Sequence, residues 1–396
     1  MQCTIEVMVR AKAEEVEVES LYEKLQAVAD YRCKRGRRYE AATVMVIVLL
    51  AKMAGEESVS GIAEWARLRE EWLKAALRLR RLPCANTYAY ICAHLDVLAL
   101  NEEIRSYFAQ RHAAQSCEEP VPSAEGQEEL VHLALDGKVL RGSAHQTPAR
   151  QSGQELLHVY AVEAGYLEHC QRIEGKGYEA ATAQAFIAEH DCAGKIITAD
   201  ALHTRPRFCR QIRRQQGEYV LVVKRNRPQL EAEIRQLFAL PPDPLYPVRT
   251  VRTVDSGHGR LTIRQLSASS ELNLALANEW RDVAQVFLLE RWVTRQGKRT
   301  YESVCGLTSL AATEATPAKL LTLVRSHWHI ENRCHWRRDA TLGEDRCTVR
   351  QPQVATVLAI LNSAILALFD HLKIANARSA MRTFDARPQL ALALLI

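Results

Sequence analysis

The chain has 396 residues, which is too long for one typical domain and predicts two or three. Hydrophobic residues make up 47% of it and charged residues 25%, an ordinary balance for a globular protein in water. Its net charge of +5 is too small to indicate a nucleic-acid partner by itself.

Cysteine usage and apolar runs indicate a cytoplasmic protein. The eleven cysteines include no CxxC pair, which argues against a disulfide framework and against a zinc site. Residues 1–10 lack the apolar core of a signal peptide. The strongest apolar run, residues 41–51, is about half of a membrane span, so we expect a buried helix there and no membrane association.

The first 115 residues have the pattern of a helical domain. Helical periodicity covers residues 21–29, 40–54, 59–77 and 86–98. Pro83 precedes the last of these helices, which carries Thr87, Tyr88 and Tyr90. Such a break before a polar and aromatic helix fits a helix-turn-helix reader of DNA. A small helical bundle that supports the rest of the chain is the alternative.

Three clusters of basic residues suit a polyanion more than the net charge does. Residues 31–39 (YRCKRGRRY) hold five Lys or Arg. The other clusters are Arg205, Arg207, Arg210, Arg213 and Arg214, and then Lys224, Arg225 and Arg227. Phosphate groups would release bound counterions at such patches. Solvated helix faces explain each cluster equally well.

An acidic segment with two prolines, residues 116–129, is predicted as an interdomain linker. After it the pattern changes to strands at 130–136, 156–162 and 166–173, a helix at 178–189, a strand at 195–199, a helix at 205–216 and a strand at 219–224. This β-β-β-α-β-α-β order is compatible with an α/β, ribonuclease-H-like mixed sheet.

A β-rich insertion at about residues 226–310 is predicted inside this second domain, which spans residues 130–375. Its strands are expected at 249–254, 260–266, 283–293 and 300–308. Long helices at 316–332 and 354–372 follow the insertion. Residues 376–396 are expected to form a C-terminal tail.

Two aspartates end apolar strands and are the first candidates for chemistry. Asp136 follows VHLAL and Asp200 follows KIITA. If the two strands are neighbours, both carboxylates lie at one edge of the sheet and can share divalent metal ions. Each aspartate could instead cap the turn or helix that follows it.

A third carboxylate is harder to choose from the residues alone. Glu331 lies in RSHWHIENRCHW, a segment with an unusual density of His and Trp. Its His327 and His335 are eight residues apart, too far along a helix to chelate one zinc ion, so phosphate contact or packing is expected. Rival acids lie just downstream at Asp339, Glu344 and Asp345.

Several motifs together resemble the insertion-sequence DDE transposases, in the H-repeat-associated branch. The resemblance rests on LDGKVLRGS at 135–143, ITADALHT at 197–204 and the Glu331 segment with GED at 343–345. It extends to RGRRY, MAGEESVSGIAEWA and the turn from Pro83 to Thr87 in the first domain, and it covers roughly residues 20–375.

The resemblance implies a metal-binding triad of Asp136, Asp200 and Glu331 that holds Mg²⁺, with Mn²⁺ as a substitute. It implies a DNA transposase that cuts and joins phosphodiester bonds at the ends of an insertion sequence. The expected partner is double-stranded DNA, both terminal inverted repeats and target, bound by a homodimer at the nucleoid in the cytoplasm. Expected DNA contacts are Lys138, Arg141, His203, Lys224, His327, Trp328 and Arg333.

The sequence departs from the family pattern in several places, among them Leu342, where an aromatic residue is usual. Arg337 and Arg338 stand where relatives have apolar residues, and Arg225 and Arg227 stand where Gly and Gln are usual. These substitutions put the packing around the Glu331 segment in doubt. A catalytically inactive DNA-binding relic and a ribonuclease-H-like nuclease without joining activity therefore stay open as alternatives.

Overall fold

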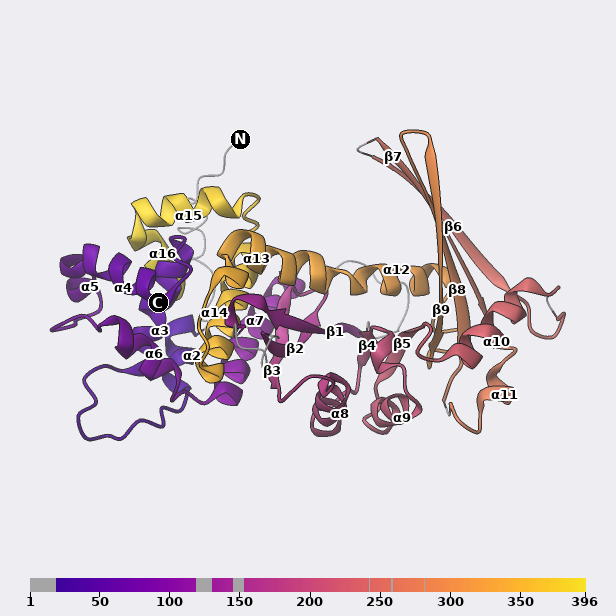
Figure 1. Cartoon of the computed structure of the whole chain (residues 1–396), viewed down its shortest axis with the longest axis horizontal. Helices are drawn as coiled ribbons and strands as arrows, with labels where there is room; N and C mark the ends of the chain where they lie inside the picture. Colours follow the sequence, from indigo (N-terminus) through magenta and orange to yellow (C-terminus); the bar gives the residue numbers. More distant parts are fainter. Residues whose placement is uncertain (1–18, 119–129, 145–152, 242, 258, 281) are drawn as a thin grey trace. The chain divides into compact units, whose positions relative to one another are not determined.

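The computed structural model of the chain (Figure 1) describes residues 19–118, 130–144, 153–241, 243–257, 259–280 and 282–396. The segment examined for a signal peptide, residues 1–10, and most of the predicted linker lie outside these residues. The chain divides into two compact units that are not contiguous in sequence. One unit comprises Ala124–Asp136 and Gly177–Ile330, and the other comprises Met1–Ser123, Gly137–Lys176 and Glu331–Ile396.

The first of these, which we call the sheet unit, is built on seven strands in the order β1-β4-β5-β9-β8-β7-β6. Strands β1 (Val131–Leu140), β4 (Lys195–Ala199) and β5 (Glu218–Val223) are parallel. The others are antiparallel to their neighbours: β6 (Arg249–Gly257), β7 (Arg260–Ser269), β8 (Gln285–Arg295) and β9 (Lys298–Thr308).

Helices connect and cover these strands. The parallel strands are joined through α8 (Glu179–Glu189) and α9 (Pro206–Arg214), and α10 (Pro228–Ala239) and α11 (Asn273–Leu276) lie in the β-rich insertion. Helix α12 (Pro317–His327) starts at the N-cap Thr316, whose hydroxyl accepts from the Lys319 amide.

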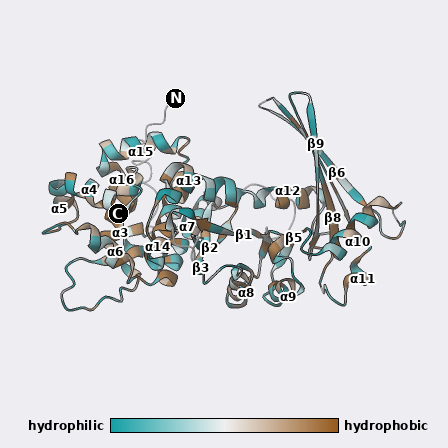
Figure 2. Ribbon diagram, viewed as in Figure 1, coloured by the Kyte–Doolittle hydropathy of each residue, from teal (hydrophilic) through white to brown (hydrophobic). Residues whose placement is uncertain are grey.

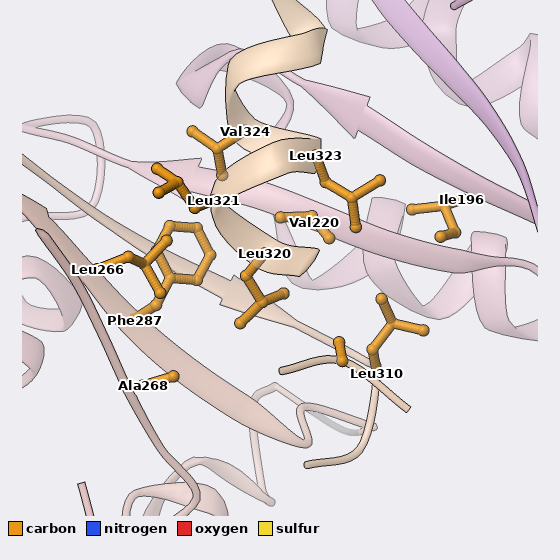
Figure 3. Packing of buried hydrophobic residues seen from close by; sticks show 11 residues of the cluster. Ile196, Val220, Leu266, Ala268, Phe287, Leu310, Leu320, Leu321, Leu323 and Val324 are labelled. Atoms are coloured by element: carbon orange, nitrogen blue, oxygen red, sulfur yellow. The ribbon is translucent and has the colours of Figure 1, made fainter. Parts of the chain in front are cut away.

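The hydrophobic core of the sheet unit lies between α12 and the sheet. Figure 3 shows Leu320, Leu321 and Val324 of α12 pointing toward Leu266 and Phe287 of the antiparallel strands. Apolar residues at a helical spacing of three and four therefore fix α12 on the sheet.

The second unit, which we call the helical unit, contains the antiparallel strands β2 (Gln154–Ala161) and β3 (Tyr166–Ile173) and most of the helices. Its first helices are α2 (Leu21–Ala27), α3 (Ala41–Met53), α4 (Val59–Leu68), α5 (Glu70–Ala76), α6 (Ala85–Cys92) and α7 (Val97–Glu118). Its last helices are α13 (Trp336–Leu342), α14 (Pro352–His371), α15 (Ala377–Ala386) and α16 (Pro388–Leu395).

Helices α3 and α14 form the centre of the helical unit. All residues of α3 are buried, and α14 packs on α3, α6, α7, α13 and β3. By length and composition α14 could also cross a membrane, but 89% of its apolar window is buried inside the structure. Such burial of α14 is typical of a core helix. The burial of α3 confirms the prediction of a buried helix at residues 41–51.

The order of elements from β1 through β5, with α8 and α9 between the later strands, is the predicted one. The prediction of an α/β, ribonuclease-H-like mixed sheet preceded by helices is therefore confirmed.

Some predicted boundaries are wrong. Strand β1 continues four residues past Asp136, to Leu140. The helix predicted at 59–77 is broken at Arg69 into α4 and α5, and the one predicted at 86–98 ends at Cys92. Helix α7 was not predicted and extends into the first residues of the expected linker.

The end of the chain and the insertion also differ from expectation. Residues predicted as a tail form α15 and α16, which contact α3. Met381, Phe384 and Leu395 bury apolar side chains there, so this segment is part of the helical core. The β-rich insertion begins with a helix, α10.

Candidate active site

Asp136 and Asp200 lie side by side at one edge of the sheet unit. The parallel pairing of β1 and β4 ends with Leu135 opposite Ala199, and each aspartate is the next residue of its strand. Neighbouring strands are about 4.8 Å apart, so the two carboxylates leave the sheet from adjacent positions. Both residues are partly exposed.

Asp200 also caps the turn that follows it. Its Oδ1 accepts a hydrogen bond of 2.9 Å from the Leu202 amide at the start of η2 (Ala201–His203). The capping role considered from the sequence is therefore real for Asp200. A carboxylate has about four acceptor positions, so the cap orients the group and leaves acceptor capacity for a metal ion.

A buried chain of three polar side chains lies behind the aspartates. The Thr198 hydroxyl is 2.8 Å from His132 Nε2 and 3.0 Å from His327 Nδ1. His132 and Thr198 precede Asp136 and Asp200 by four and two residues, so side chains of each pair leave the same side of their strand. His327 is the last residue of α12, and the chain thus connects two strands with that helix.

His132 and His327, the two histidines of this hydrogen-bonded group, are neutral at physiological pH. Burial lowers the pKa of His132 to about 3, with a further contribution from His327 and His329. Burial, followed by the nearby His203 and Lys224, lowers the pKa of His327 to about 4. The sequence left phosphate contact and packing open for His327, and its hydrogen bond to Thr198 agrees with packing.

Glu331 lies in a π-helix, Ile330–His335, that separates α12 from α13. The continuous helix predicted at 316–332 is therefore wrong at its C-terminal end. A π-turn inserts one extra residue per turn, so the faces of α12 do not continue into this segment, and such turns are frequent at functional sites. The side chain of Glu331 is exposed. Glu331 belongs to the helical unit, whereas the two aspartates belong to the sheet unit.

The rival acids downstream of Glu331 are engaged inside the helical unit. Both carboxylate oxygens of Asp339 accept from Lys138 Nζ, at 2.7 and 2.9 Å. Asp345 Oδ1 accepts from the Arg141 amide at 3.1 Å, and Glu344 is 5% exposed. All three downstream acids thus have partners or are buried within the helical unit.

Arg338, one of the departures from the family pattern, is completely buried. Its Nε and Nη2 donate to Glu344 Oε1 at 3.0 and 2.7 Å, and Asn362 Nδ2 donates to the same oxygen at 2.9 Å. Arg338 Nη1 lies 3.0 Å from His158 Nε2, and His158 Nδ1 lies 2.9 Å from His335 Nε2. Arg338 is thus held by Glu344 and His158 inside the helical unit.

The proton positions of the two histidines follow from this network. An arginine can only donate, so His158 Nε2 accepts and the ring carries its proton on Nδ1, which donates to His335. Burial and then the positive charge of Arg338 hold the pKa of His158 well below its usual range. Arg337, another departure, forms an ion pair of 2.6 Å with Asp370 of α14.

The predicted DNA contacts divide into exposed and internal side chains. Lys138 and His203 are internal, and the latter places Nε2 3.0 Å from Glu179 Oε1. His327 is half-buried on Thr198. The exposed ones are Arg141, Lys224, Trp328 and Arg333. DNA contact by any of the seven stays a prediction.

The donor set fits a divalent metal ion in chemistry. Mg²⁺ prefers carboxylate oxygens and keeps several waters, so few protein ligands are needed. Asp136 and Asp200 provide two carboxylates at adjacent strand positions. Across the part of the chain that the structure describes, no group of three or more His, Cys, Asp or Glu is arranged to hold a metal. The role of Glu331 as third ligand stays a prediction.

Sequence reasoning missed the two buried networks. His132 and Thr198 were visible as polar residues inside otherwise apolar strands, on alternate positions from the aspartates. Their partner His327 is 129 residues away from Thr198, and His158 is 180 residues away from Arg338. No local pattern identifies partners at such separations.

Comparisons with known proteins agree on one family. Residues 127–368 match the family described as "Transposase DDE domain", and residues 22–108 match the one described as "DDE_Tnp_1-associated". The first match alone covers more than half of the chain.

Relatives along nearly the whole chain have similar descriptions. The chain is 22% identical over 380 residues to the "H repeat-associated putative transposase YhhI" of Escherichia coli K12, covering 93% of this chain and 95% of that protein. It is 21% identical over 355 residues to the "Putative transposase YncI" of Escherichia coli O157:H7, covering 89% and 87%. A piggyBac transposase synaptic complex with hairpin DNA aligns with a TM-score of 0.41 and 10% identity over 90% of this chain and 71% of that one, a likeness too weak to carry an argument.

Proposed function

The chain belongs to the DDE transposases, in their H repeat-associated branch, and we propose that it cuts and joins DNA at the ends of an insertion sequence. The family membership gives the class of protein. The observation that supports the chemistry is the pair of carboxylates, Asp136 and Asp200, at adjacent positions on parallel strands.

The proposed reaction has two steps at phosphorus. A water molecule attacks a phosphodiester at the element's end, the P–O3′ bond breaks, and a free 3′-hydroxyl and a 5′-phosphate result. That hydroxyl then attacks a phosphodiester of the target, forming a new P–O bond as the target's own 3′-oxygen leaves. Two divalent ions at such a site activate the attacking oxygen and neutralise the leaving one.

In this proposal, Asp136, Asp200 and Glu331 are the ligands that hold Mg²⁺, or Mn²⁺ in its place. The cap on Asp200 restricts the directions in which its carboxylate can point. Such restriction lowers the entropy lost when ligands and substrate are brought into line.

The DNA itself is proposed to be held by exposed cations and by the helical N-terminal residues. Lys34, Arg35 and Arg38 of the first basic cluster are exposed, while Arg32 is buried on Asp30. The exposed cations would contact phosphates of the terminal inverted repeats and the target: Lys34, Arg35 and Arg38, together with Arg141, Lys224 and Arg333. Two ends must be brought together, so we propose a homodimer on DNA, acting at the nucleoid.

The test is a cleavage assay on a labelled duplex that carries the terminal sequence of the element encoding the chain, with Mg²⁺. Asp136→Asn, Asp200→Asn and Glu331→Gln should bind this duplex and fail to cut it. The matched control is Glu189→Gln, which removes an exposed carboxylate from α8 in the sheet unit and should leave cleavage unchanged.

The outcomes separate the proposal from its alternatives. Cleavage without strand-transfer products would point to a nuclease without joining activity. Binding without cleavage by the wild type would leave only a DNA-binding relic. Cleavage retained by Glu331→Gln would move the third ligand to another acid and contradict the proposed triad.

A further inference from the structure

The antiparallel part of the sheet unit ends in a four-stranded segment that we call the outer ribbon, residues 253–257, 260–264, 291–295 and 298–302. Figure 1 shows these strand ends extending past α12. Figure 2 shows mainly hydrophilic colours toward the same ends. Most side chains here are exposed, in contrast to the inner halves of the same strands.

Strand register assigns each ribbon residue to one of two faces, because paired residues on neighbouring strands share a face and alternate rows face opposite ways. The row of Leu266 and Leu289 packs toward α12. Counting outward by two from it, the row of Arg260, Arg295 and Lys298 lies on this same face. We call it the α12 face.

The inner half of the opposite face is covered by α10. Arg235 Nη1 of that helix donates to Ser303 Oγ at 2.8 Å. The outer half carries a row of apolar and aromatic side chains, in which Trp292 and Tyr301 have ring centroids 5.5 Å apart. Arg299, in the next row, lies over the Trp292 ring at 5.8 Å. This face is therefore largely apolar, and its outer cation is already placed on a ring.

The α12 face has the opposite character at its outermost row. Arg260 is paired with Arg295, and Arg295 is paired with Lys298. All three are exposed, and within the described ranges none of the three side chains forms a hydrogen bond or ion pair with another residue. Like charges directly opposite each other on neighbouring strands destabilise a sheet.

The row is held in this register by a tight turn. Gln296 and Gly297 both have positive φ, 49° and 74°, as a two-residue type I′ hairpin requires. The turn fixes Arg295 opposite Lys298 whatever their charges. Further in, Arg264 and Arg325 share the carboxylate of Asp255, and Arg291 pairs with Glu302 at 3.0 Å. The cations further in thus have carboxylate partners, whereas no carboxylate is paired with the three cations of the outermost row.

Three cations across three neighbouring strands lie within about 10 Å, which is one screening length at ordinary salt, so they act as one positive patch. We propose that the outermost row of the α12 face contacts the phosphodiester backbone of duplex DNA. A polyanion removes the mutual repulsion of the three cations and releases its own counterions. The inference rests on the proposed function for the identity of the partner.

The test compares two double variants, each of which removes two charges from one face of the antiparallel strands. Arg260→Gln with Arg295→Gln changes the α12 face, and Arg252→Gln with Arg299→Gln changes the opposite face. Binding of the full chain to a short labelled duplex of arbitrary sequence is measured by fluorescence anisotropy over a fourfold range of salt. Each phosphate contact contributes about 0.9 to the slope of log affinity against log salt.

We expect the α12-face variant to lose about 1.8 from that slope, so that its affinity falls roughly 12-fold less over the fourfold salt range. The opposite-face variant should keep the wild-type slope, and Arg260→Lys with Arg295→Lys should keep it too. The midpoint temperature of thermal unfolding of the α12-face variant should be no lower than that of the wild type, because the repulsion within two like-charge pairs is removed.

The wild-type slope in both double variants would overturn the inference and leave the proposed function standing. A loss of slope in both variants would overturn the assignment to one face. Absence of salt-dependent duplex binding by the wild type would contradict the proposed function and the inference together.

Discussion

The two buried polar networks of this chain satisfy their polar groups in different ways. In the sheet unit, the neutral side chains of His132 and His327 both contact the hydroxyl of Thr198. In the helical unit, the fully buried Arg338 and Glu344 are a charged pair. A neutral hydrogen bond contributes about 1 kcal/mol, whereas an unpaired buried charge costs several.

Because of this difference, we expect the two networks to tolerate substitutions differently. The neutral chain can lose a member at moderate cost, because the remaining groups are uncharged. The charged pair tolerates only joint change, because each ion depends on the other for compensation. Both lie close in sequence to the proposed metal ligands, so their loss also tests how much the site depends on its support.

The largest effect is expected for Glu344→Gln. This substitution keeps the shape of the side chain but leaves Arg338 as an uncompensated cation in the core. We expect the free energy of unfolding to fall by about 3–5 kcal/mol. Urea denaturation followed by circular dichroism measures it.

The matched control is the double replacement Arg338→Leu with Glu344→Leu, which removes both charges and should be less damaging than the single change. If Glu344→Gln lowers the free energy of unfolding by no more than an exposed substitution does, about 0.5 kcal/mol, then another group compensates the Arg338 charge. The proposed contrast between the charged pair and the neutral network would then be wrong.

An effect of about 2 kcal/mol is expected from pH acting on His327. Its pKa is lowered from 6.5 to about 4, so between these values the unfolded chain binds more protons than the folded one. The free energy of unfolding therefore falls as pH falls, by about 2 kcal/mol for this residue from pH 7 to pH 5.

The measurement is urea denaturation of the wild type and of His327→Gln at both pH values. Glutamine does not titrate, so the variant should lose less stability on acidification than the wild type, by that amount. Identical losses in the two proteins would show that His327 is not held neutral by the fold.

The smallest effect is expected for Thr198→Val, which removes the shared hydroxyl and keeps the volume of the side chain. Two neutral histidines then lose one partner each, at about 1–2 kcal/mol in the free energy of unfolding. Thr198→Ser retains the hydroxyl and should restore most of the loss.

Thr198→Val also tests whether the hydroxyl positions the aspartate-bearing strands or only stabilises the fold. If the hydroxyl positions the strands that carry the aspartates, the Mg²⁺ concentration needed for half-maximal cleavage should rise in Thr198→Val and recover in Thr198→Ser. An unchanged Mg²⁺ requirement would limit Thr198 to a role in stability.

The sheet and the aspartate pair were predictable because both depend on local pattern. Apolar runs ending in Asp136 and Asp200 identify parallel strands, and such strands share one edge. Helix α7 was not assigned, although it lies mostly in the part of the chain expected to be helical and Leu100, Ile104 and Phe108 are buried at helical spacing.

The surroundings of Glu331 could not be predicted in the same way. The π-turn at Ile330–His335 depends on how α12 and α13 are held at both ends, which no local propensity encodes. The burial of Arg338 depends on His158 and Asn362, on two other elements. Substitutions that looked disruptive in sequence are compensated by these distant partners.

Arg338 also constrains the routes by which this chain can diverge. A change of Arg338 alone to an apolar residue would leave Glu344 buried without its cation, and a change of Glu344 alone would leave Arg338 buried without its anion. Each single change is therefore expected to cost stability that the paired change does not. Descendants of this sequence should retain both residues or exchange both.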